Sequence, residues 1–157
     1  MSGHNNAIVE QVVVKAPRAT VFKALTDAGE LMRWFPTRVQ SDARPGGKFR
    51  FEWDFNAAEQ NGWQEGTYLE VVPNQQISYG WAAGKDPSLP TTVTFELSEA
   101  RGETTVSLNH AGWGEGPGSE ELRANHAGPW HFYMQNLKSY LEEGKDGRAA
   151  AIGQKTA

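Results

Sequence analysis

Large aromatic side chains occupy every second position from residue 49 to residue 55, and charged side chains lie between them. Successive side chains of a β-strand point to opposite faces, so this pattern predicts a strand with one aromatic and one charged face. The aromatic face has to be covered, and how completely it is covered decides whether the fold can hold a ligand. The aromatic residues are Phe49, Phe51, Trp53 and Phe55, and the charged ones are Lys48, Arg50, Glu52 and Asp54.

Composition points to one globular domain. The 157 residues, 38% hydrophobic and 22% charged, suffice for a buried core, so we expect a single domain over residues 7–143 with flexible tails at 1–6 and 144–157. The absence of cysteine excludes disulfides and thiolate chemistry. A net charge of −4 with both signs interspersed argues against a nucleic-acid surface. Apolar runs are too short for a membrane span and residues 1–6 lack a signal-peptide pattern, so we expect a cytoplasmic protein that does not bind membranes.

Helix and turn signals organise the first third of the chain. Residues 8–15 are rich in valine and predict a strand. Pro17 suits the start of a helix, and Gly29 is its expected end. Residues 31–35 predict one more helical turn, which Pro36 stops because the residue before a proline avoids the helical region.

The middle of the chain predicts an antiparallel meander of some six strands after the short helices. Segments of alternating apolar and polar residues are separated by turn signals at Asn61-Gly62, Pro73-Asn74 and Ala100-Arg101-Gly102. The clearest strands are 49–55, 64–72, 77–81, 92–98 and 104–110, with a loop at 84–90.

A long amphipathic helix is predicted after a glycine-rich break at residues 112–118. Ser119 is its expected N-cap, and Pro129 predicts a kink or restart near Gly128. The elements together predict an α+β fold in which a curved antiparallel sheet grips this helix, with two short helices between the first two strands. The apolar stripe of the long helix is Trp130, Met134, Leu137 and Leu141, and one turn earlier it reaches His126.

Three N-terminal segments also follow a familiar pattern: Ala16-Pro17-Arg18, residues 21–27 and Trp34-Phe35. This pattern resembles the opening of the activator-of-Hsp90-ATPase-like branch of the START and birch-pollen-allergen-like (SRPBCC) superfamily. The likeness extends over residues 8–143 and implies a helix-grip fold with a hydrophobic cavity between the sheet and the last helix. Later segments that resemble the family are 66–73, His110-Ala111-Gly112-Trp113 and 130–141.

The candidate ligand-binding residues are those expected on the inner aromatic face and at its rim. Small-molecule sites are usually concave and apolar, with a few polar groups that orient the ligand. The competing interpretation is that the same side chains fill the interior and leave no space. The residues are Trp34, Phe51, Trp53, Tyr79, Trp81, Phe95, Leu108, His110, Trp113, His126, Trp130 and Met134.

Some of these residues have two interpretations each. His110 and His126 could orient a polar ligand group or act as a general base, or they could be hydrogen-bonded into the structure. Trp34 and Trp113 are expected near the cavity mouth, as lids or as ordinary packing. No histidine–carboxylate pair has metal-ligand spacing and no nucleophile has a triad pattern, so no metal or catalytic residue is predicted.

The superfamily hosts lipid carriers, hormone receptors, aromatase/cyclases and co-chaperones on one scaffold, so the resemblance is less specific for function than for fold. The inward aromatic face together with the resemblance favours a non-catalytic protein that binds a small hydrophobic ligand, lipid-like or aromatic, with no cofactor. The alternatives are an aromatase/cyclase-like enzyme and a chaperone-regulating interaction module. A homodimer through an exposed sheet edge is also open.

Overall fold

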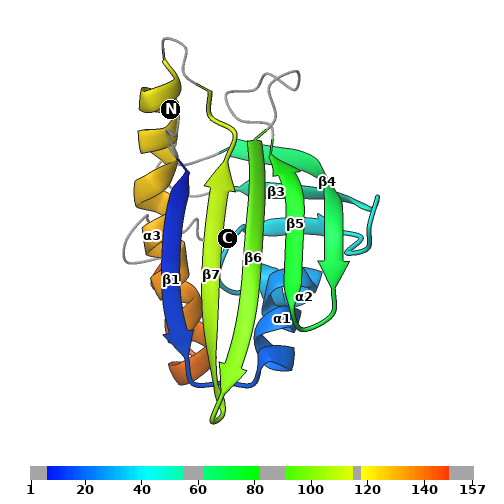
Figure 1. Cartoon of the computed structure of the whole chain (residues 1–157), viewed down its shortest axis with the longest axis vertical. Helices are drawn as coiled ribbons and strands as arrows, with labels where there is room; N and C mark the ends of the chain where they lie inside the picture. The colour runs from blue at the N-terminus through cyan, green and yellow to red at the C-terminus, as the bar shows by residue number, and fades with distance from the viewer. Residues whose placement is uncertain (1–6, 55–61, 82–90, 115–117, 149–157) are drawn as a thin grey trace.

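A computed structural model describes residues 7–54, 62–81, 91–114 and 118–148, and it confirms the α+β class. Within these residues, seven antiparallel strands form one curved sheet in the order β1-β7-β6-β5-β4-β3-β2. The long helix α3 and the short helices α1 and α2 lie on the same side of the sheet, which is the predicted helix grip (Figure 1). The strands are β1 (Ile8–Val14), β2 (Arg38–Ser41), β3 (Lys48–Trp53), β4 (Gly62–Val72), β5 (Gln76–Trp81), β6 (Thr91–Ala100) and β7 (Glu103–Ala111), and the helices are α1 (Arg18–Thr26), α2 (Ala28–Leu31) and α3 (Ser119–Glu143).

Two short helices lie between the first two strands as predicted, but the second, α2, begins at Ala28 and not at the predicted residue 31. Pro17 precedes α1 with φ −65°, where its missing N–H is no loss. α1 ends before the expected stop at Gly29, because Asp27 leaves the helical region with ψ 129°. The Asp27 carboxylate then accepts a hydrogen bond from the backbone N–H of Glu30 at 3.0 Å, which caps α2. One aspartate therefore ends the first helix and starts the second, and Gly29 lies inside α2.

The strand registers confirm the meander. Phe95 pairs with Ile77 on β5 and with Leu108 on β7, so apolar side chains of three neighbouring strands share the inner face. The turn between β6 and β7 lies at Arg101 and Gly102, both with positive φ, as the sequence predicted. Asn61, Phe55 and the predicted loop at 84–90 lie outside the described residues.

Helix α3 runs through Pro129 as one continuous element, so the expected restart before this proline does not occur. Proline removes the hydrogen bond to the Asn125 carbonyl, but the packing of the following turns holds the helix together. The N-cap is Gly118, with φ 86°, and no side chain caps the helix, so the prediction for Ser119 is wrong. The buried face comprises Trp130, Tyr133, Met134, Asn136 and Leu137.

Residues 144–148 fall within the tail that was predicted from residue 144, and they make hydrogen bonds with the rest of the domain. Gly144 ends α3 in the left-handed conformation with φ 68°, and the backbone N–H of Gly147 then donates to the Asn136 side chain at 2.7 Å. Arg148 is only 3% exposed, because backbone carbonyls and Asp146 surround its guanidinium. The other parts of the predicted tails, 1–6 and 149–157, lie outside the described residues. None of the described helices is long and apolar enough to cross a membrane.

Candidate ligand-binding pocket

The middle of the inner aromatic face is packed solid. Phe49 and Phe51 are buried, with ring centroids 4.5 Å apart, and Tyr79 on β5 lies 4.9 Å from Phe49. Gly66 permits this packing, because a Cβ atom there would lie 2.7 Å from the Phe49 ring and would collide with the Gly80 carbonyl. For these residues the core-packing interpretation holds.

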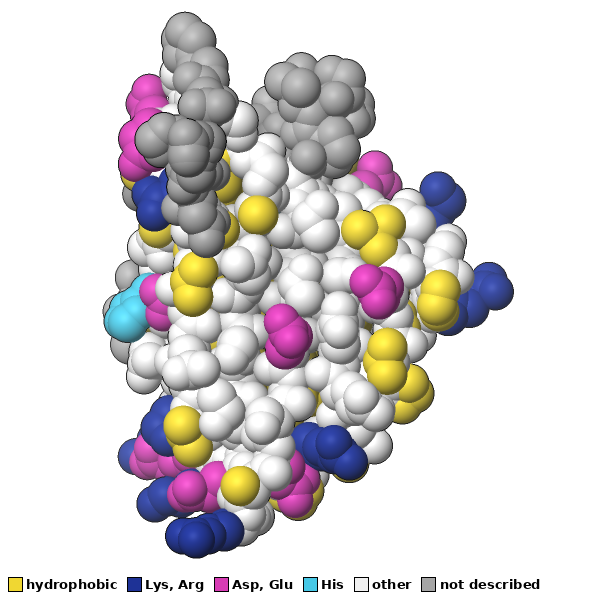
Figure 2. All heavy atoms as spheres, in the orientation of Figure 1, with side chains coloured by type: hydrophobic (Ala, Val, Ile, Leu, Met, Phe, Trp, Pro, Cys, Tyr) yellow, Lys and Arg dark blue, Asp and Glu magenta, His cyan; other side chains and the backbone are white. Residues whose placement is uncertain are grey.

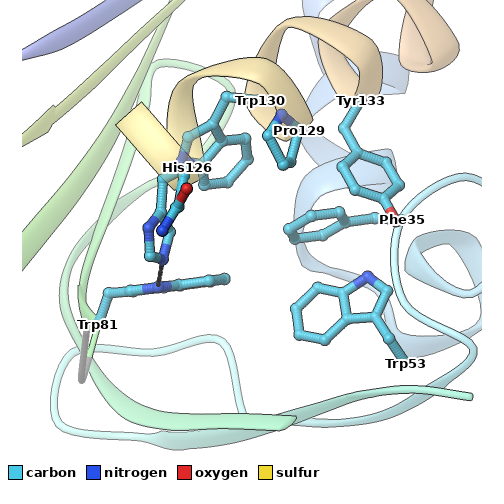
Figure 3. Close-up of a pocket in the computed structure, with 8 residues that line it drawn as sticks. Phe35, Trp53, Trp81, His126, Pro129, Trp130 and Tyr133 are labelled. Atoms are coloured by element: carbon cyan, nitrogen blue, oxygen red, sulfur yellow. Dashed lines mark hydrogen bonds between the residues drawn. The ribbon is translucent and has the colours of Figure 1, made fainter. Parts of the chain in front are cut away.

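A pocket of about 190 Å³ opens at the end of this face, below the N-terminal half of α3. Its lining residues form two groups, one from each side of the pocket (Figure 3). The groups touch where Phe35 stacks on Trp130 and where Trp53 meets Trp81 edge-on at 6.1 Å. One group consists of Trp81, His126 and Trp130. The other consists of Phe35, Trp53 and Tyr133. Asn125 and Pro129 of α3 complete the lining.

The first group is held by hydrogen bonds that fix the ring of His126. Its Nδ1 lies 2.9 Å from the Leu122 carbonyl, which can only accept, so Nδ1 carries the proton. Its Nε2 then accepts from the indole N–H of Trp81 at 3.3 Å. Burial lowers the pKa of His126, although the backbone hydrogen bond to Leu122 opposes this. Both ring nitrogens of the neutral form are therefore in use.

A second chain of hydrogen bonds runs behind this group, through His110. The indole N–H of Trp130 donates to Nδ1 of His110 at 2.9 Å, so Nε2 carries the proton and donates to the Thr91 hydroxyl at 2.6 Å. The hydroxyl donates in turn to the Trp81 carbonyl at 3.0 Å. Burial, and secondarily the nearby His126, lowers the pKa of His110 to about 3. This histidine is neutral at pH 7 and acts as a hydrogen-bonded core residue.

The second group is centred on Phe35. Its ring stacks on Trp130 at 5.3 Å and meets Trp53 and Tyr133 edge-on at 5.2 and 5.0 Å. Phe35 therefore forms the closed end that joins the two groups. It is 3% exposed and follows directly after Trp34 in the short segment between α2 and β2.

The polar groups of the second group of lining residues are the Trp53 indole N–H and the Tyr133 hydroxyl. Trp53 Nε1 is buried and forms no hydrogen bond of normal geometry with the described residues. Burial raises the pKa of Tyr133 to about 12, although the charge of Arg148 and the nearby Trp53 indole both lower it. The hydroxyl therefore stays protonated at neutral pH and is able to donate.

Four of the twelve candidate residues line this pocket: Trp53, Trp81, His126 and Trp130. Trp34 and Trp113 are buried, and their indole groups donate to the carbonyls of Ala24 and His110, so neither is placed as an exposed lid. Whether any of the twelve binds a ligand stays a prediction. The buried residues that do not line the pocket are Trp34, Phe51, Tyr79, Phe95, Leu108, His110, Trp113 and Met134.

Sequence reasoning missed Phe35, Asn125, Pro129 and Tyr133 among the lining residues. Pro129 and Tyr133 are one residue before and three residues after Trp130, which places them beside the predicted apolar stripe of the helix. Phe35 was expected near the cavity mouth as part of Trp34-Phe35-Pro36, but it was not named as a candidate binding residue. Nothing local distinguished which of these two rings would point into the pocket.

Within the described ranges there is no group of three or more histidine, cysteine or acidic side chains placed to hold a metal ion. The ionisable groups in the pocket lining are His126 and Tyr133, the first fully hydrogen-bonded and the second protonated. The arrangement is suited to holding a ring-shaped apolar molecule more than to proton transfer.

Comparison with known protein families identifies the family to which this chain belongs. The model of the family "Activator of Hsp90 ATPase homolog 1-like protein" matches residues 15–142, and the chain belongs to this family. The resemblance stated from the sequence is thereby confirmed. No curated protein matches the chain.

Several solved structures share the fold. The Aha1 dimer from Colwellia psychrerythraea is 24% identical, with a TM-score of 0.74 over 88% of this chain and 98% of the other. CV1439 from Chromobacterium violaceum is 27% identical, with a TM-score of 0.71 over 87% and 97%. CalU16 from Micromonospora echinospora is 22% identical, with a TM-score of 0.69 over 88% and 77%. At such identities the likeness establishes the helix-grip architecture, and function has to be argued from the site.

Proposed function

We propose that this protein binds a small planar aromatic molecule of one or two rings in the pocket between Phe35, Trp53 and Tyr133 on one side and Trp81 and Trp130 on the other. The pocket volume of about 190 Å³ supports this size class. An apolar cavity of about 150 Å³ in another protein is large enough for benzene. The acyl chain of a common lipid occupies a larger volume than this, so the aromatic class is favoured over the lipid-like class.

The chemistry of the lining supports the same choice. Aromatic walls offer edge and face contacts that favour another ring by about 0.5–1.5 kcal/mol per pair beyond area burial. The protonated Tyr133 hydroxyl is a donor, so a ligand with an oxygen acceptor would be oriented by it. A phenol or an aryl ketone has both properties.

The enzyme alternative has less support. A general base needs a free lone pair and a pKa near the working pH. Both nitrogens of His126 are hydrogen-bonded, and the pKa of His110 is about 3. Neither histidine is free to accept a proton from a ligand in this arrangement.

A protein-docking role also has less support on the visible outer face of the sheet. Hydrophobic side chains there lie in small separate groups within a mostly polar surface (Figure 2). The large exposed ones include Val9 on β1 and Trp63 and Leu69 on β4, two strands that are far apart in the sheet order. Such scattered residues are normal for a protein surface.

The test is to block the pocket from its rim. Asn125 is exposed at the pocket lining, so Asn125→Trp places a large ring over the opening with little cost to folding. Ala124→Trp is the matched control, because Ala124 is exposed on the same helix but does not line the pocket. Each protein is titrated with indole, 2-naphthol and a long-chain fatty acid while tryptophan fluorescence and calorimetric heat are followed.

We expect the wild-type protein and Ala124→Trp to bind 2-naphthol saturably with one site. Asn125→Trp should bind it at least about tenfold more weakly, equivalent to about 1.4 kcal/mol. Preference for the fatty acid, or equal binding by the two tryptophan variants, would show that this pocket is not the site of a small aromatic ligand.

A further inference from the structure

A buried cluster at the end of α3 holds the segment that carries Phe35. The guanidinium of Arg148 donates to the backbone carbonyls of Met32 at 2.7 Å, Phe35 at 3.1 Å and Pro36 at 2.8 Å. These carbonyls lie at or beyond the C-terminal end of α2, and the guanidinium supplies them with N–H donors. One side chain from beyond the last helix thus satisfies three carbonyls of a segment more than 100 positions earlier in the chain.

Asp146 and Asn136 complete the cluster. Asp146 accepts from Arg148 Nε at 3.0 Å and from Nη2 at 2.8 Å, which balances the buried charge. Burial opposes ionisation of Asp146, but the hydrogen bonds from Arg148 and Asn136 outweigh it and lower its pKa. The Asn136 amide donates to the Trp34 carbonyl at 2.8 Å and to Asp146 at 3.1 Å. We refer to Asn136, Asp146 and Arg148 as the C-terminal anchor.

The anchor and the pocket meet at Phe35. Its carbonyl is bound by Arg148, and its ring stacks on Trp130 and meets Trp53 edge-on. Residues 32–37 belong to no strand or long helix. The backbone N–H groups of Phe35 and Thr37 bond to the carbonyls of Leu31 at 2.9 Å and Glu52 at 2.8 Å, and Arg148 binds the carbonyls of Met32, Phe35 and Pro36. Leaving the three carbonyls without their buried donor would cost roughly 1–3 kcal/mol each unless the segment moved to reach water.

We infer that Arg148 is a positioning residue for the pocket: it holds Phe35 as the closed end and thereby sets the size of ligand that the pocket accepts. This inference rests on the proposed function, because it concerns the selectivity of the same site. Without the guanidinium, the Met32–Pro36 segment is released, Phe35 withdraws and the pocket lengthens. Small ligands then lose a wall, and larger ring systems gain room.

The experiment compares two probes of different size, 2-naphthol and 1-hydroxypyrene. In Arg148→Ala, the affinity for 2-naphthol should fall about tenfold, and the affinity ratio of 1-hydroxypyrene to 2-naphthol should rise by at least as much. Arg148→Lys keeps the charge but lacks the planar fork, so it should shift the ratio in the same direction by less. Arg148→Lys also provides the test of the affinity ratio if the Arg148→Ala protein folds poorly. Lys145→Ala is the control, because Lys145 is an exposed cation of the same segment that pairs with Glu143 at 3.4 Å.

A double-mutant cycle separates positioning from general stability. In a Phe35→Leu background, Arg148→Ala should no longer change the affinity ratio, although it should still lower the unfolding temperature. An unchanged ratio in the single variant, or a ratio that changes equally in both backgrounds, would overturn the inference.

Failure of the proposed function is recognised separately. If the wild-type protein binds neither probe, the anchor is tested by the near-ultraviolet circular dichroism of its tryptophans without ligand. Arg148→Ala should then change the bands of Trp53 and Trp130, because both rings pack against Phe35, and Lys145→Ala should not. An unaltered spectrum in a folded Arg148→Ala protein would contradict the positioning role.

Discussion

Two regions of the inner aromatic face differ, the packed region around Phe51 and the open region around Trp53, although the same alternation of side chains produces both. Around Phe51, rings from several strands close on one another, and this side chain is 1% exposed. Around Trp53, two positions further along β3, the packing stops and the pocket begins. Trp53 is half-buried, and its indole N–H has no hydrogen-bond partner of normal geometry among the described residues.

The difference between the two regions comes from the strands and the helix that surround each of them. Phe51 lies in the interior of β3, paired with Val39 of β2 on one side and Gln64 of β4 on the other. Trp53 and Trp81 are the last residues of their strands. Beside the Trp130 and Tyr133 rings, the helix above them presents the smaller side chains of Asn125 and Pro129. Alternating aromatic residues therefore pack into the core where the neighbouring strands continue. They line a pocket where the strands end and the side chains of the helix do not fill the space above them.

The largest expected effect is on stability, and it compares the packed region with the open region directly. Phe51→Ala should lower the free energy of unfolding by about 3–5 kcal/mol, because it leaves a cavity in the packed region. Trp53→Ala should cost roughly half as much, since its side chain already borders open space. Urea denaturation measures both. Equal losses in the free energy of unfolding, or a larger loss for Trp53→Ala, would contradict the distinction between a packed and an open region.

Stability at acid pH tests the hydrogen bond next to the pocket in which His110 accepts from the Trp130 indole N–H. Below its ordinary pKa of 6.5, the unfolded chain binds a proton that the folded His110 does not take up until about pH 3. Stability should therefore be full above pH 6.5 and should fall through this window as pH drops, by about 1.4 kcal/mol per pH unit for one proton. His126, whose pKa is also lowered, adds to the slope in the same direction.

The variant His110→Asn isolates this contribution. It should lose about 1–3 kcal/mol at neutral pH, because the Trp130 and Thr91 hydrogen bonds are disrupted, and its stability should depend less steeply on pH between 6.5 and 3. A pH dependence identical to that of the wild-type protein would mean that His110 is not buried in the neutral form.

The smallest expected effect compares the two pocket tryptophans under the same substitution. Trp81→Phe removes an N–H that is bonded to His126, whereas Trp53→Phe removes one that lies near the Tyr133 hydroxyl without a hydrogen bond of normal geometry. The loss of unfolding free energy should be about 1 kcal/mol greater for Trp81→Phe, since only that change breaks a hydrogen bond of normal geometry. Thermal unfolding followed by calorimetry measures the difference, and a greater loss for Trp53→Phe would contradict the assignment of the unbonded indole.

Much of the fold was predictable because period-two alternation and turn residues act locally. The strands around Phe51 and Phe95 and the turn at Arg101-Gly102 follow from neighbouring residues alone. The exact ends of helices were less predictable. Asp27 and Gly118 act as caps where Gly29 and Ser119 were expected to end or begin a helix, because several nearby residues can serve.

The pocket was only partly predictable. Trp53, Trp81 and Trp130 follow from strand and helix periodicity, but the point where packing gives way to open space depends on how strands of different length meet the helix. The anchor could not be foreseen. Arg148 follows a stretch of small and polar residues typical of a tail, and its partners are carbonyls more than 100 positions away, which carry no side-chain signal.

The most direct test of the pocket uses the indole N–H groups as reporters in two-dimensional ¹⁵N NMR during a titration with 2-naphthol. We predict saturable shifts of the Trp53, Trp81 and Trp130 signals, which line the pocket. The signals of Trp34, bonded to the Ala24 carbonyl in the core, and of Trp63, exposed on β4, should move little. Shifts confined to Trp63, or no saturable shift at the three pocket indoles, would contradict the account.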